Sequence, residues 1–251
     1  MIGIPDLALT WPRKVRSIHQ VEVTSRCSLS CCYCPSPQIV KGKIPGRDAR
    51  DMTREHYLRT LEWVAHYVKA GTQGELNLAG TGESTLHPDF IDFLRLARET
   101  MGDLPITFAT NGVGATEEMV AKMAPYKPLV WVSLHRPEKA GPAIEIYKKH
   151  GILTGFSNDP ALNGNDWAGQ VKWYRSNPSY FTGCRWMRDG ELFVFSDGRI
   201  TTCGFDASAF NTLGHIDEEI GSVGLKPGPL CQRCHYVIGV KGWDQKKGEF
   251  A

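Results

Sequence analysis

Short apolar runs alternate with amphipathic stretches over the first two thirds of this chain. That alternation is typical of strand-helix-strand units, in which parallel strands form one sheet and crossover helices cover it. We predict five such strands, at residues 18–24, 75–80, 106–110, 129–134 and 152–157. The chain is therefore expected to adopt an α/β fold around a parallel sheet.

Crossover helices are predicted between these strands. Apolar residues recur at helical spacing in residues 52–70, and again in residues 88–100 after a proline that suits a first helical turn. Thr116, followed by two glutamates, predicts the start of a third helix. A fourth is predicted at residues 137–150 and ends at Gly151, a residue that favours helix termination.

The strand-helix rhythm ends after residue 157. Residues 158–175 are rich in Asn, Asp and Gly, and we predict no sixth strand of the same kind after them. The chain length allows one main domain and a small module. We therefore expect a main domain at residues 1–175 and a module at residues 176–251.

The module is expected to contain a β-hairpin and a short helix. Residues 192–195 and 200–203 flank a Ser-Asp-Gly turn, in which Gly198 is free to adopt a positive φ. The helix is predicted near residues 216–223.

Charge and hydropathy exclude several classes of partner. Lys and Arg number 29 against 27 Asp and Glu, so the net charge of +2 gives no field that favours nucleic acid or an acidic membrane. No apolar stretch approaches the roughly 20 residues that a membrane span requires, and the amino-terminal residues lack the pattern of a signal peptide. We expect a cytoplasmic protein that binds neither nucleic acid nor a membrane.

The eight cysteines fall into two groups. Four lie between Cys27 and Cys34, four lie between Cys184 and Cys234, and the 149 residues from Cys34 to Cys184 contain none. In a protein that is not exported, such groups argue for metal binding, because the cytosol keeps thiols reduced.

Cys27, Cys31 and Cys34 form a C-x3-C-x2-C motif directly after the first predicted strand. They are therefore expected at the carboxyl edge of the sheet, where active sites of such sheets lie. Three thiolates fill three irons of a cubane and leave the fourth iron open, whereas a structural zinc takes four ligands. A zinc site or chance spacing is the alternative, and Cys32, at a variable position, is expected to bind no metal.

With Tyr33 before the third cysteine, this motif resembles the signature of the radical S-adenosylmethionine (radical SAM) superfamily. The resemblance covers residues 15–160 and implies a partial (β/α) TIM-type barrel of about five or six parallel strands. It also implies a [4Fe-4S] cluster on Cys27, Cys31 and Cys34, with S-adenosylmethionine chelated by the open iron. Reductive cleavage of S-adenosylmethionine then gives a 5′-deoxyadenosyl radical that abstracts a hydrogen atom.

The segment Gly80-Thr81-Gly82-Glu83 resembles the Gly-Gly-Glu motif of that superfamily, which lines the site of the methionyl ammonium. Glu83 is the predicted partner of this ammonium, because a carboxylate accepts charge-assisted hydrogen bonds. Thr81 departs from the family pattern. The alternative is that Glu83 only opens the next helix.

Three further cofactor-binding residues are predicted at strand ends, together with Tyr33. By resemblance, Ser133 binds the ribose or the methionyl carboxylate. Asn111 follows the third strand, where a turn or packing role is the alternative, and Asn158 follows the fifth.

The second cysteine group reads C-x13-G-x4-C from Cys184 through Gly198 to Cys203, followed by Cys231-x2-Cys234. This pattern resembles the auxiliary-cluster module called twitch, a shortened form of the SPASM module. Four thiolates saturate a second [4Fe-4S] cluster, which suits electron transfer. A zinc ion on the same four thiolates is the competing hypothesis.

A saturated second cluster beside a radical site suggests an oxidation, and the chain resembles the short 2-deoxy-scyllo-inosamine dehydrogenases in size and organisation. We predict a radical SAM oxidoreductase that acts on a small natural-product or carbohydrate-type substrate. The candidate bases are His135, Arg136 and Arg185. An external electron donor such as flavodoxin or ferredoxin is the expected partner.

Two alternatives stay open. One is a maturase that epimerises or crosslinks a ribosomally made peptide, although only 26 residues precede Cys27, too few for a leader-peptide-binding domain. The other is a non-catalytic zinc-binding module.

Overall fold

The computed structural model describes residues 14–157, Trp167, Gln170 and residues 184–234, together with the backbone of residues 243–244 and 249–250. No helix in these parts of the chain is both long enough and apolar enough to cross a membrane.

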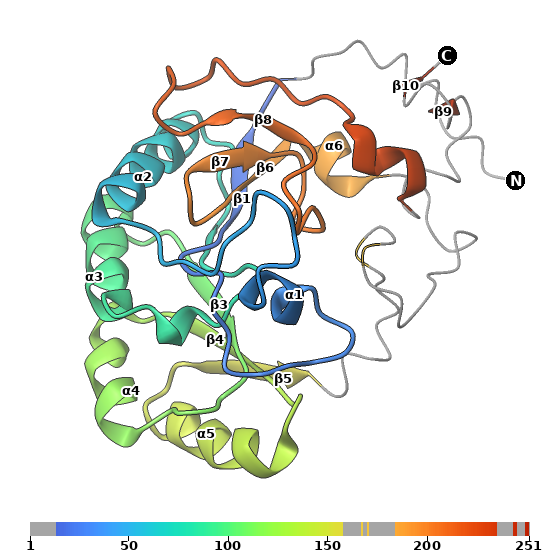
Figure 1. The fold of residues 1–251 in the computed structure, drawn as a ribbon. Coiled ribbons are helices and arrows are strands. Elements are labelled where there is room, and N and C mark those ends of the chain that lie inside the picture. Colours follow the sequence, from blue (N-terminus) through green and yellow to red (C-terminus); the bar gives the residue numbers. More distant parts are fainter. Residues whose placement is uncertain are drawn as a thin grey trace, which may run out of the picture.

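One eight-stranded sheet organises the fold (Figure 1). Its strands are β1 (Ser17–Val21), β2 (Leu76–Asn77), β3 (Ile106–Thr110), β4 (Leu129–Ser133), β5 (Leu153–Ser157), β6 (Glu191–Val194), β7 (Arg199–Thr201) and β8 (Thr212–His215). In space they follow the order β5-β4-β3-β2-β1-β6-β7-β8. A separate two-stranded sheet pairs β9 (Trp243–Asp244) with β10 (Glu249–Phe250).

The five predicted strands are confirmed, and β1 to β5 pair side by side in parallel. The prediction that no sixth strand of this kind follows was wrong, because β6 pairs in parallel with the other edge of β1. β6 is also the first arm of the predicted hairpin with β7, and β8 continues that antiparallel part. In a hairpin, each strand uses one side for its partner and leaves the other side free to pair. Here β7 pairs with one side of β6, and β1 pairs with the other. The sheet thus runs from the parallel strands into the carboxyl-terminal strands without a break.

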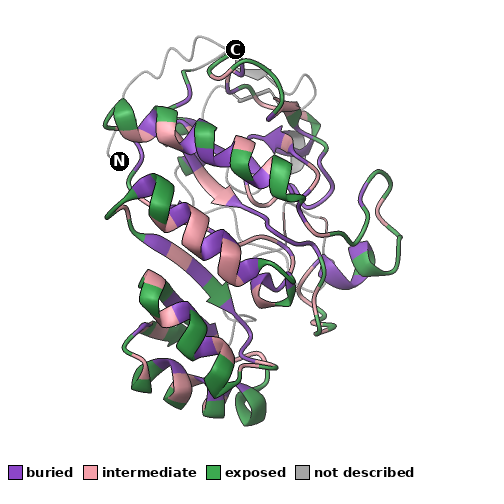
Figure 2. Cartoon of the chain, turned by 90° about the vertical axis from the view of Figure 1, so that its left-hand side faces the viewer, coloured by how far each residue is buried: buried purple, intermediate pink, exposed green. Residues whose placement is uncertain are grey.

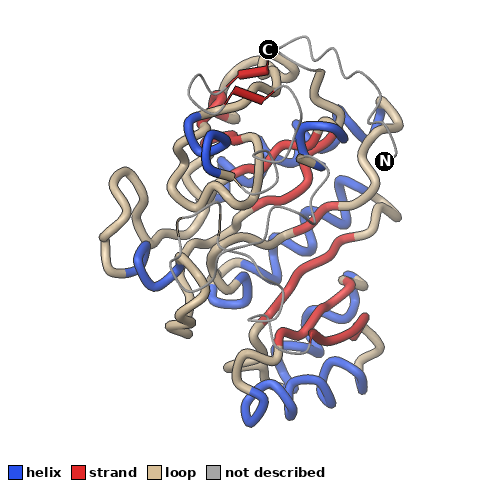
Figure 3. The backbone as a smooth tube through the Cα atoms, turned by 90° about the vertical axis from the view of Figure 1, so that its right-hand side faces the viewer, coloured by secondary structure: helices blue, strands red, loops and turns tan. Residues whose placement is uncertain are grey.

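Four crossover helices cover one face of the parallel strands: α2 (Arg54–Lys69), α3 (Phe90–Met101), α4 (Glu117–Met123) and α5 (Pro137–Lys149). As predicted, Thr116 caps α4, since its side chain accepts a hydrogen bond from the Met119 N–H. Figure 2 looks onto this layer, where exposed and buried residues alternate along each helix. From the opposite side the strands lie in front of the helices (Figure 3).

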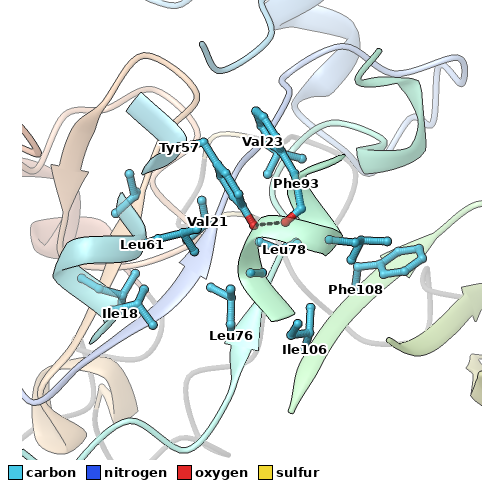
Figure 4. Close-up of a cluster of buried hydrophobic side chains, with 14 of the residues drawn as sticks. Ile18, Val21, Val23, Tyr57, Leu61, Leu76, Leu78, Phe93, Ile106 and Phe108 are labelled. Atoms are coloured by element: carbon cyan, nitrogen blue, oxygen red, sulfur yellow. Dashed lines mark hydrogen bonds between the residues drawn. The ribbon is translucent and has the colours of Figure 1, made fainter. Parts of the chain in front are cut away.

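The core lies between the sheet and these helices, and Figure 4 shows its centre. Tyr57 of α2 stacks on Phe93 of α3 with ring centroids 3.9 Å apart, and its hydroxyl donates to the Phe93 carbonyl oxygen. Both side chains are fully buried. Burial of a side chain of this kind stabilises a fold by about 1.5–3 kcal/mol. This packing holds the strands that carry the site residues.

Short helices were harder to predict from the sequence. The structure adds α1 (Ser36–Val40), α6 (Arg185–Asp189), η1 (Ser84–Leu86), η2 (Ala124–Tyr126) and η5 (Pro229–Arg233). The helix predicted near residues 216–223 is wrong, because the chain forms turns there. The Ile216 carbonyl accepts hydrogen bonds from the side chains of Arg59 and Trp63 in α2, so it is not available to a helix.

Candidate active site

The first cysteine group lies in the loop between β1 and α1. The Cys27 sulfur accepts a hydrogen bond from the Leu29 N–H at 3.5 Å. Burial is the main cause that raises the pKa of the Cys34 thiol, to about 12, and the nearby Cys27 and Cys31 act in the same direction. The three predicted ligands therefore share one site, in which each thiol must lose its proton when a metal binds.

The Gly80 to Glu83 segment packs directly against the start of this loop. A Cβ on Gly82 would overlap the carbonyl oxygens of Thr24 and Arg26. The Glu83 N–H donates to the Arg26 carbonyl at 2.8 Å. The two glycine positions of the motif thus allow a close backbone approach, since a Cβ on Gly80 would overlap the Glu22 side chain. This approach fits the site that the sequence predicts for S-adenosylmethionine beside the cysteine loop.

Glu83 is buried, and its carboxylate joins the ends of β2 and β3. Oε1 accepts from the Thr85 hydroxyl at 2.7 Å and from the Thr85 N–H at 3.3 Å. Oε2 accepts from the Asn111 N–H at 2.7 Å. Burial raises the pKa of Glu83. Glu83 therefore caps η1, as the structural alternative stated, while its contact with an ammonium stays a prediction.

The structure brings the end of β3 to the first cysteine. The Asn111 side-chain amide lies 3.8 Å from the Cys27 sulfur as a donor, and its Oδ1 accepts from the Val113 N–H. Asn111 is thus both a turn residue and a neighbour of the cysteine loop. Ser133 ends β4 in register with Ser157 of β5, at the same edge of the sheet. Asn158 lies outside the described residues.

Tyr33 and His135 connect the cysteine loop to the end of β4. The Tyr33 hydroxyl oxygen lies 2.6 Å from Nδ1 of His135, within hydrogen-bond distance. Arg136 follows as the residue before α5, exposed and 3.8 Å from the Glu138 carboxylate. Two of the candidate bases are therefore at the carboxyl edge of the sheet.

The third candidate base lies elsewhere. Arg185 begins α6, and its guanidinium is 3.9 Å from the carboxylate of Glu191, the first residue of β6. Glu191 is in register with Ser17, which opens β1. Arg185 therefore lies by the amino-terminal ends of β1 and β6, whereas His135 lies at the carboxyl-terminal ends of the parallel strands.

The second cysteine group is also brought together. One cavity is lined by Cys184, Cys203, Cys231 and Cys234, together with Trp186, Thr202, Asn211 and Leu230. Burial is the main cause that raises the pKa of Cys203, and the other three cysteines add to it. Gly198 has φ +85°, as the hairpin prediction required.

Asn211 supports the second cysteine group, and sequence reasoning missed it. Its amide donates to the Cys231 sulfur at 3.4 Å, and its Oδ1 accepts from the Leu230 N–H. The Gly228 N–H also donates to the Cys231 sulfur. An asparagine in a turn gives no signal of such a contact in the sequence.

A row of aromatic side chains joins the two cysteine groups. The Trp167 indole N–H donates to the Tyr33 carbonyl at 3.2 Å, and its ring contacts Phe205, with centroids 5.8 Å apart. Phe205 in turn contacts Trp186, with centroids 4.7 Å apart, and Trp186 lines the second cavity. The sequence predicted neither contact, because these residues are far apart in the chain.

Sequence reasoning also missed a buried ion pair between Glu22 and Arg47. Their side chains are fully buried, and Arg47 Nη2 lies 2.7 Å from Glu22 Oε1. Glu22 also accepts from the hydroxyls of Thr81 and Ser196. Thr81, the departure from the family motif, thus has a structural partner. The sequence signal for this buried pair was a glutamate placed between two apolar residues, Val21 and Val23, in and just after β1.

Known proteins resemble this chain in sequence and in fold. The PqqA peptide cyclase of Ruegeria pomeroyi is 34% identical over 97 residues, which are 38% of this chain and 22% of that protein, so the match spans about a fifth of that relative. The structure of BtrN in complex with AdoMet and 2-DOIA has a TM-score of 0.65 at 17% identity, covering 83% of this chain and 81% of that one.

A second solved structure, anSMEcpe with bound AdoMet and the Cp18Cys peptide, has a TM-score of 0.53 at 18% identity. The match covers 81% of this chain and 78% of that chain. Likenesses at such identities show the fold alone. The family model described as the radical SAM superfamily matches residues 21–157, more than half of the sequence. Together with the cysteine loop and the parallel sheet, this match shows that the chain belongs to the radical SAM superfamily.

Proposed function

We propose that Cys27, Cys31 and Cys34 hold the [4Fe-4S] cluster that membership of the superfamily implies, with S-adenosylmethionine bound beside it. When bound, these groups supply a 5′-deoxyadenosyl radical that takes a hydrogen atom from the substrate. The close approach of Gly82 to the cysteine loop supports this site. Cys32, the fourth cysteine of the loop, is exposed, which agrees with three ligands and one open iron.

Glu83 is the residue that we assign to the methionyl ammonium. Its carboxylate is oriented by the N–H groups of Asn111 and Thr85, and each oxygen has lone pairs that can accept further hydrogen bonds. Burial strengthens a charge-assisted hydrogen bond, because the local dielectric is low. Ser133 is assigned to the ribose or the methionyl carboxylate from the same edge.

His135 is the base that the geometry favours. A histidine accepts a proton at Nε2 only if Nδ1 already carries its hydrogen. Tyr33 permits that tautomer, because a phenolic oxygen both donates and accepts hydrogen bonds. Arg136 is less suited, since a guanidinium is protonated at any physiological pH. Arg185 lies at the opposite edge of the sheet.

Cys184, Cys203, Cys231 and Cys234 are proposed to hold a second [4Fe-4S] cluster. The four side chains line one cavity, and four thiolates saturate such a cluster, which suits it to electron transfer. The iron and zinc content of the loaded protein separates this cluster from a zinc ion held by the same four thiolates.

The reaction that we propose is oxidation of a small natural-product or carbohydrate-type substrate. His135 would take a proton from the substrate, the adenosyl radical would take a hydrogen atom, and a cluster held by the four cysteines would supply the acceptor for one electron, which together amount to a two-electron oxidation. The observation that carries this proposal is the convergence of four cysteines on one cavity that aromatic residues connect to the first site. The fold likeness to BtrN, solved in complex with AdoMet and 2-DOIA, agrees with it.

Peptide maturation is the second candidate. It is favoured by the sequence identity to a PqqA peptide cyclase, and by the fold likeness to anSMEcpe, which was solved with a bound peptide. Membership of the radical SAM superfamily argues against a non-catalytic zinc-binding module.

Anaerobic reconstitution tests these assignments. We expect about eight irons per chain, and about four when Cys184 and Cys203 are both replaced by Ala. With S-adenosylmethionine and dithionite, the protein should release 5′-deoxyadenosine. Cys31→Ala should abolish this release, whereas Cys32→Ala should retain it. Absence of release from fully loaded protein would refute the radical assignment.

A substrate panel separates the two candidates. The loaded enzyme is incubated with aminocyclitols, amino sugars and thioether-forming or tyrosine-containing peptides. Oxidised carbohydrate-type product, two mass units lighter than its substrate, would support the oxidoreductase. If only the peptides are turned over, the oxidoreductase assignment is wrong and the maturase assignment takes its place.

A further inference from the structure

A group of metal-ligating side chains lies outside the cysteine sites. It consists of His56 of α2, His215 at the end of β8, and Asp217 in the turn that follows. Their ligand atoms all lie within 4.8 Å of one another. The group contains none of the residues assigned above, and it joins a crossover helix to the carboxyl-terminal part of the sheet.

The hydrogen bonds of His215 fix the hydrogen on one ring nitrogen. Nε2 lies 2.9 Å from the Asp197 carbonyl oxygen, which can only accept, so Nε2 carries the hydrogen. In a neutral imidazole Nδ1 then presents a lone pair. That nitrogen is 3.1 Å from Oδ2 of Asp217 and accepts a hydrogen bond from the Asp217 N–H at 3.3 Å. The imidazole nitrogen and the carboxylate oxygen are thus two neighbouring donor atoms that one cation, either a proton or a metal ion, can join.

The surroundings of His56 favour a metal ion over a proton. Its ring meets that of His215 edge to face with centroids 5.3 Å apart, and its Nδ1 is buried without a hydrogen-bond partner. A proton on His215 would satisfy Asp217 but would give His56 nothing, and an unpartnered buried nitrogen is unfavourable. A metal ion instead takes a nitrogen of His56 as a third ligand, because one ligand atom of each of the three residues lies within 4.8 Å of the others.

The backbone that carries these ligands is held firmly against α2. The Ile216 carbonyl accepts from Trp63 Nε1 at 2.8 Å and from Arg59 Nε at 2.9 Å. Ligands on an anchored turn lose little freedom when they bind an ion. Arg59 places one positive charge nearby, but its guanidinium forms an ion pair with Glu62, and the Glu218 carboxylate accepts from the His215 N–H. The local charge therefore favours a cation.

We propose that His56, His215 and Asp217 bind one divalent ion of the zinc class, with water in the open coordination positions. Two imidazoles and one carboxylate suit zinc and neighbouring transition metals better than calcium or magnesium, which prefer oxygen ligands. The ion fastens the turn after β8 to α2. This proposal is independent of the function assigned to the cysteine sites.

Zinc titration of the cluster-loaded protein under anaerobic conditions tests the site. Isothermal titration calorimetry should show one saturable ion per chain, and iron is counted before and after to verify that both cysteine groups stay loaded. His56→Ala and Asp217→Ala should each weaken binding about tenfold or more, as expected for loss of one of three ligands. His66→Ala removes an exposed histidine from the same helix and should bind like the parent.

Thermal unfolding gives a second readout. At a hundredfold excess of zinc over its dissociation constant, the parent and His66→Ala should gain roughly 5–10 °C in Tm, and the other two variants should gain about half of that or less. Without zinc, the Tm values of all variants report whether they fold. Equal binding by the parent and the folded His56→Ala protein, or no saturable binding by the parent, would overturn the proposal.

Discussion

Glu22 carries a negative charge into a fully buried part of the sheet, where Arg47 neutralises it. The guanidinium also lies over the Phe195 ring, 4.2 Å from its centroid, and donates to the Ala207 carbonyl. The Thr81 hydroxyl, after the end of β2, also donates a hydrogen bond to the Glu22 carboxylate. A single buried pair thus contacts the segment proposed to bind S-adenosylmethionine and the loops around β6 and β7.

Arg47→Met should lower the free energy of unfolding by about 3–5 kcal/mol, because it leaves the Glu22 carboxylate buried and unpaired. The double variant Glu22→Gln with Arg47→Met should recover part of this loss, since no net charge is then buried. Urea unfolding followed by tryptophan fluorescence measures both. A double variant no more stable than Arg47→Met would contradict the charge argument.

Gly82→Ala tests the close backbone approach at the proposed cofactor site. The new methyl group would overlap two carbonyl oxygens of the cysteine loop, so the loop or the segment must move. We expect a loss of about 1–3 kcal/mol in unfolding free energy, as for other overpacked sites, and a clear reduction in 5′-deoxyadenosine release. Gly74→Ala is the matched control, because its added Cβ would meet no atom within 4 Å. Similar losses of stability and of 5′-deoxyadenosine release in both variants would refute the explanation by overlap at Gly82.

At the scale of elements, local patterns predicted most of the fold. The five parallel strands and four crossover helices follow from apolar spacing and from caps such as Thr116, which act within a few residues. The pairing of β6 with β1 did not follow, because it joins residues more than 170 positions apart. The false helix after β8 failed for the same reason, since distant side chains of α2 hold the Ile216 carbonyl.

In the candidate site, too, some residues could be predicted from the sequence and others could not. Seven cysteines were predicted as ligands from their spacing and from the family resemblance, and the structure gathers them into two groups. Their binding of metal stays a prediction. The supporting residues Asn211 and Phe205 were not found, since no pattern marks a turn asparagine or a single aromatic residue as a neighbour of a metal site. Sequence thus singles out candidate ligands whose side-chain chemistry is distinctive, while tertiary structure is needed to identify the residues that surround them.

The junction of β1 and β6 gives a pH prediction. Partial burial raises the pKa of Glu191 in β6, and its Oε2 has no hydrogen-bond partner. Its neutral form is therefore favoured in the folded state. The stability that Glu191 contributes is fully present below its unfolded pKa, near 4.5, and is lost as the pH rises through the higher folded value.

Glu191→Gln should remove this dependence. Relative to the variant, the parent should become less stable as the pH rises from about 4.5, and the difference should level off at higher pH. Comparing Tm values of the two proteins at each pH cancels effects of acid on any bound cluster. A difference that stays constant with pH would show that Glu191 does not titrate differently on folding.

For the whole molecule, the two cysteine groups form a single system only if electrons pass between the first site and the second. Phe205 is the middle of the aromatic row that connects them, because it touches Trp167 on one side and Trp186 on the other. Aromatic rings shorten the gaps across which an electron must tunnel. Phe205→Leu keeps the apolar bulk and removes the ring.

We expect Phe205→Leu to release 5′-deoxyadenosine at a rate close to that of the parent, since the first cysteine group is untouched. It should form less oxidised product per 5′-deoxyadenosine, because the substrate radical loses its electron more slowly and is quenched. Phe210→Leu, which alters an exposed ring in the same loop, should leave that ratio unchanged. Product and 5′-deoxyadenosine are quantified together by mass spectrometry, and an unchanged ratio in Phe205→Leu with both clusters loaded would exclude this route.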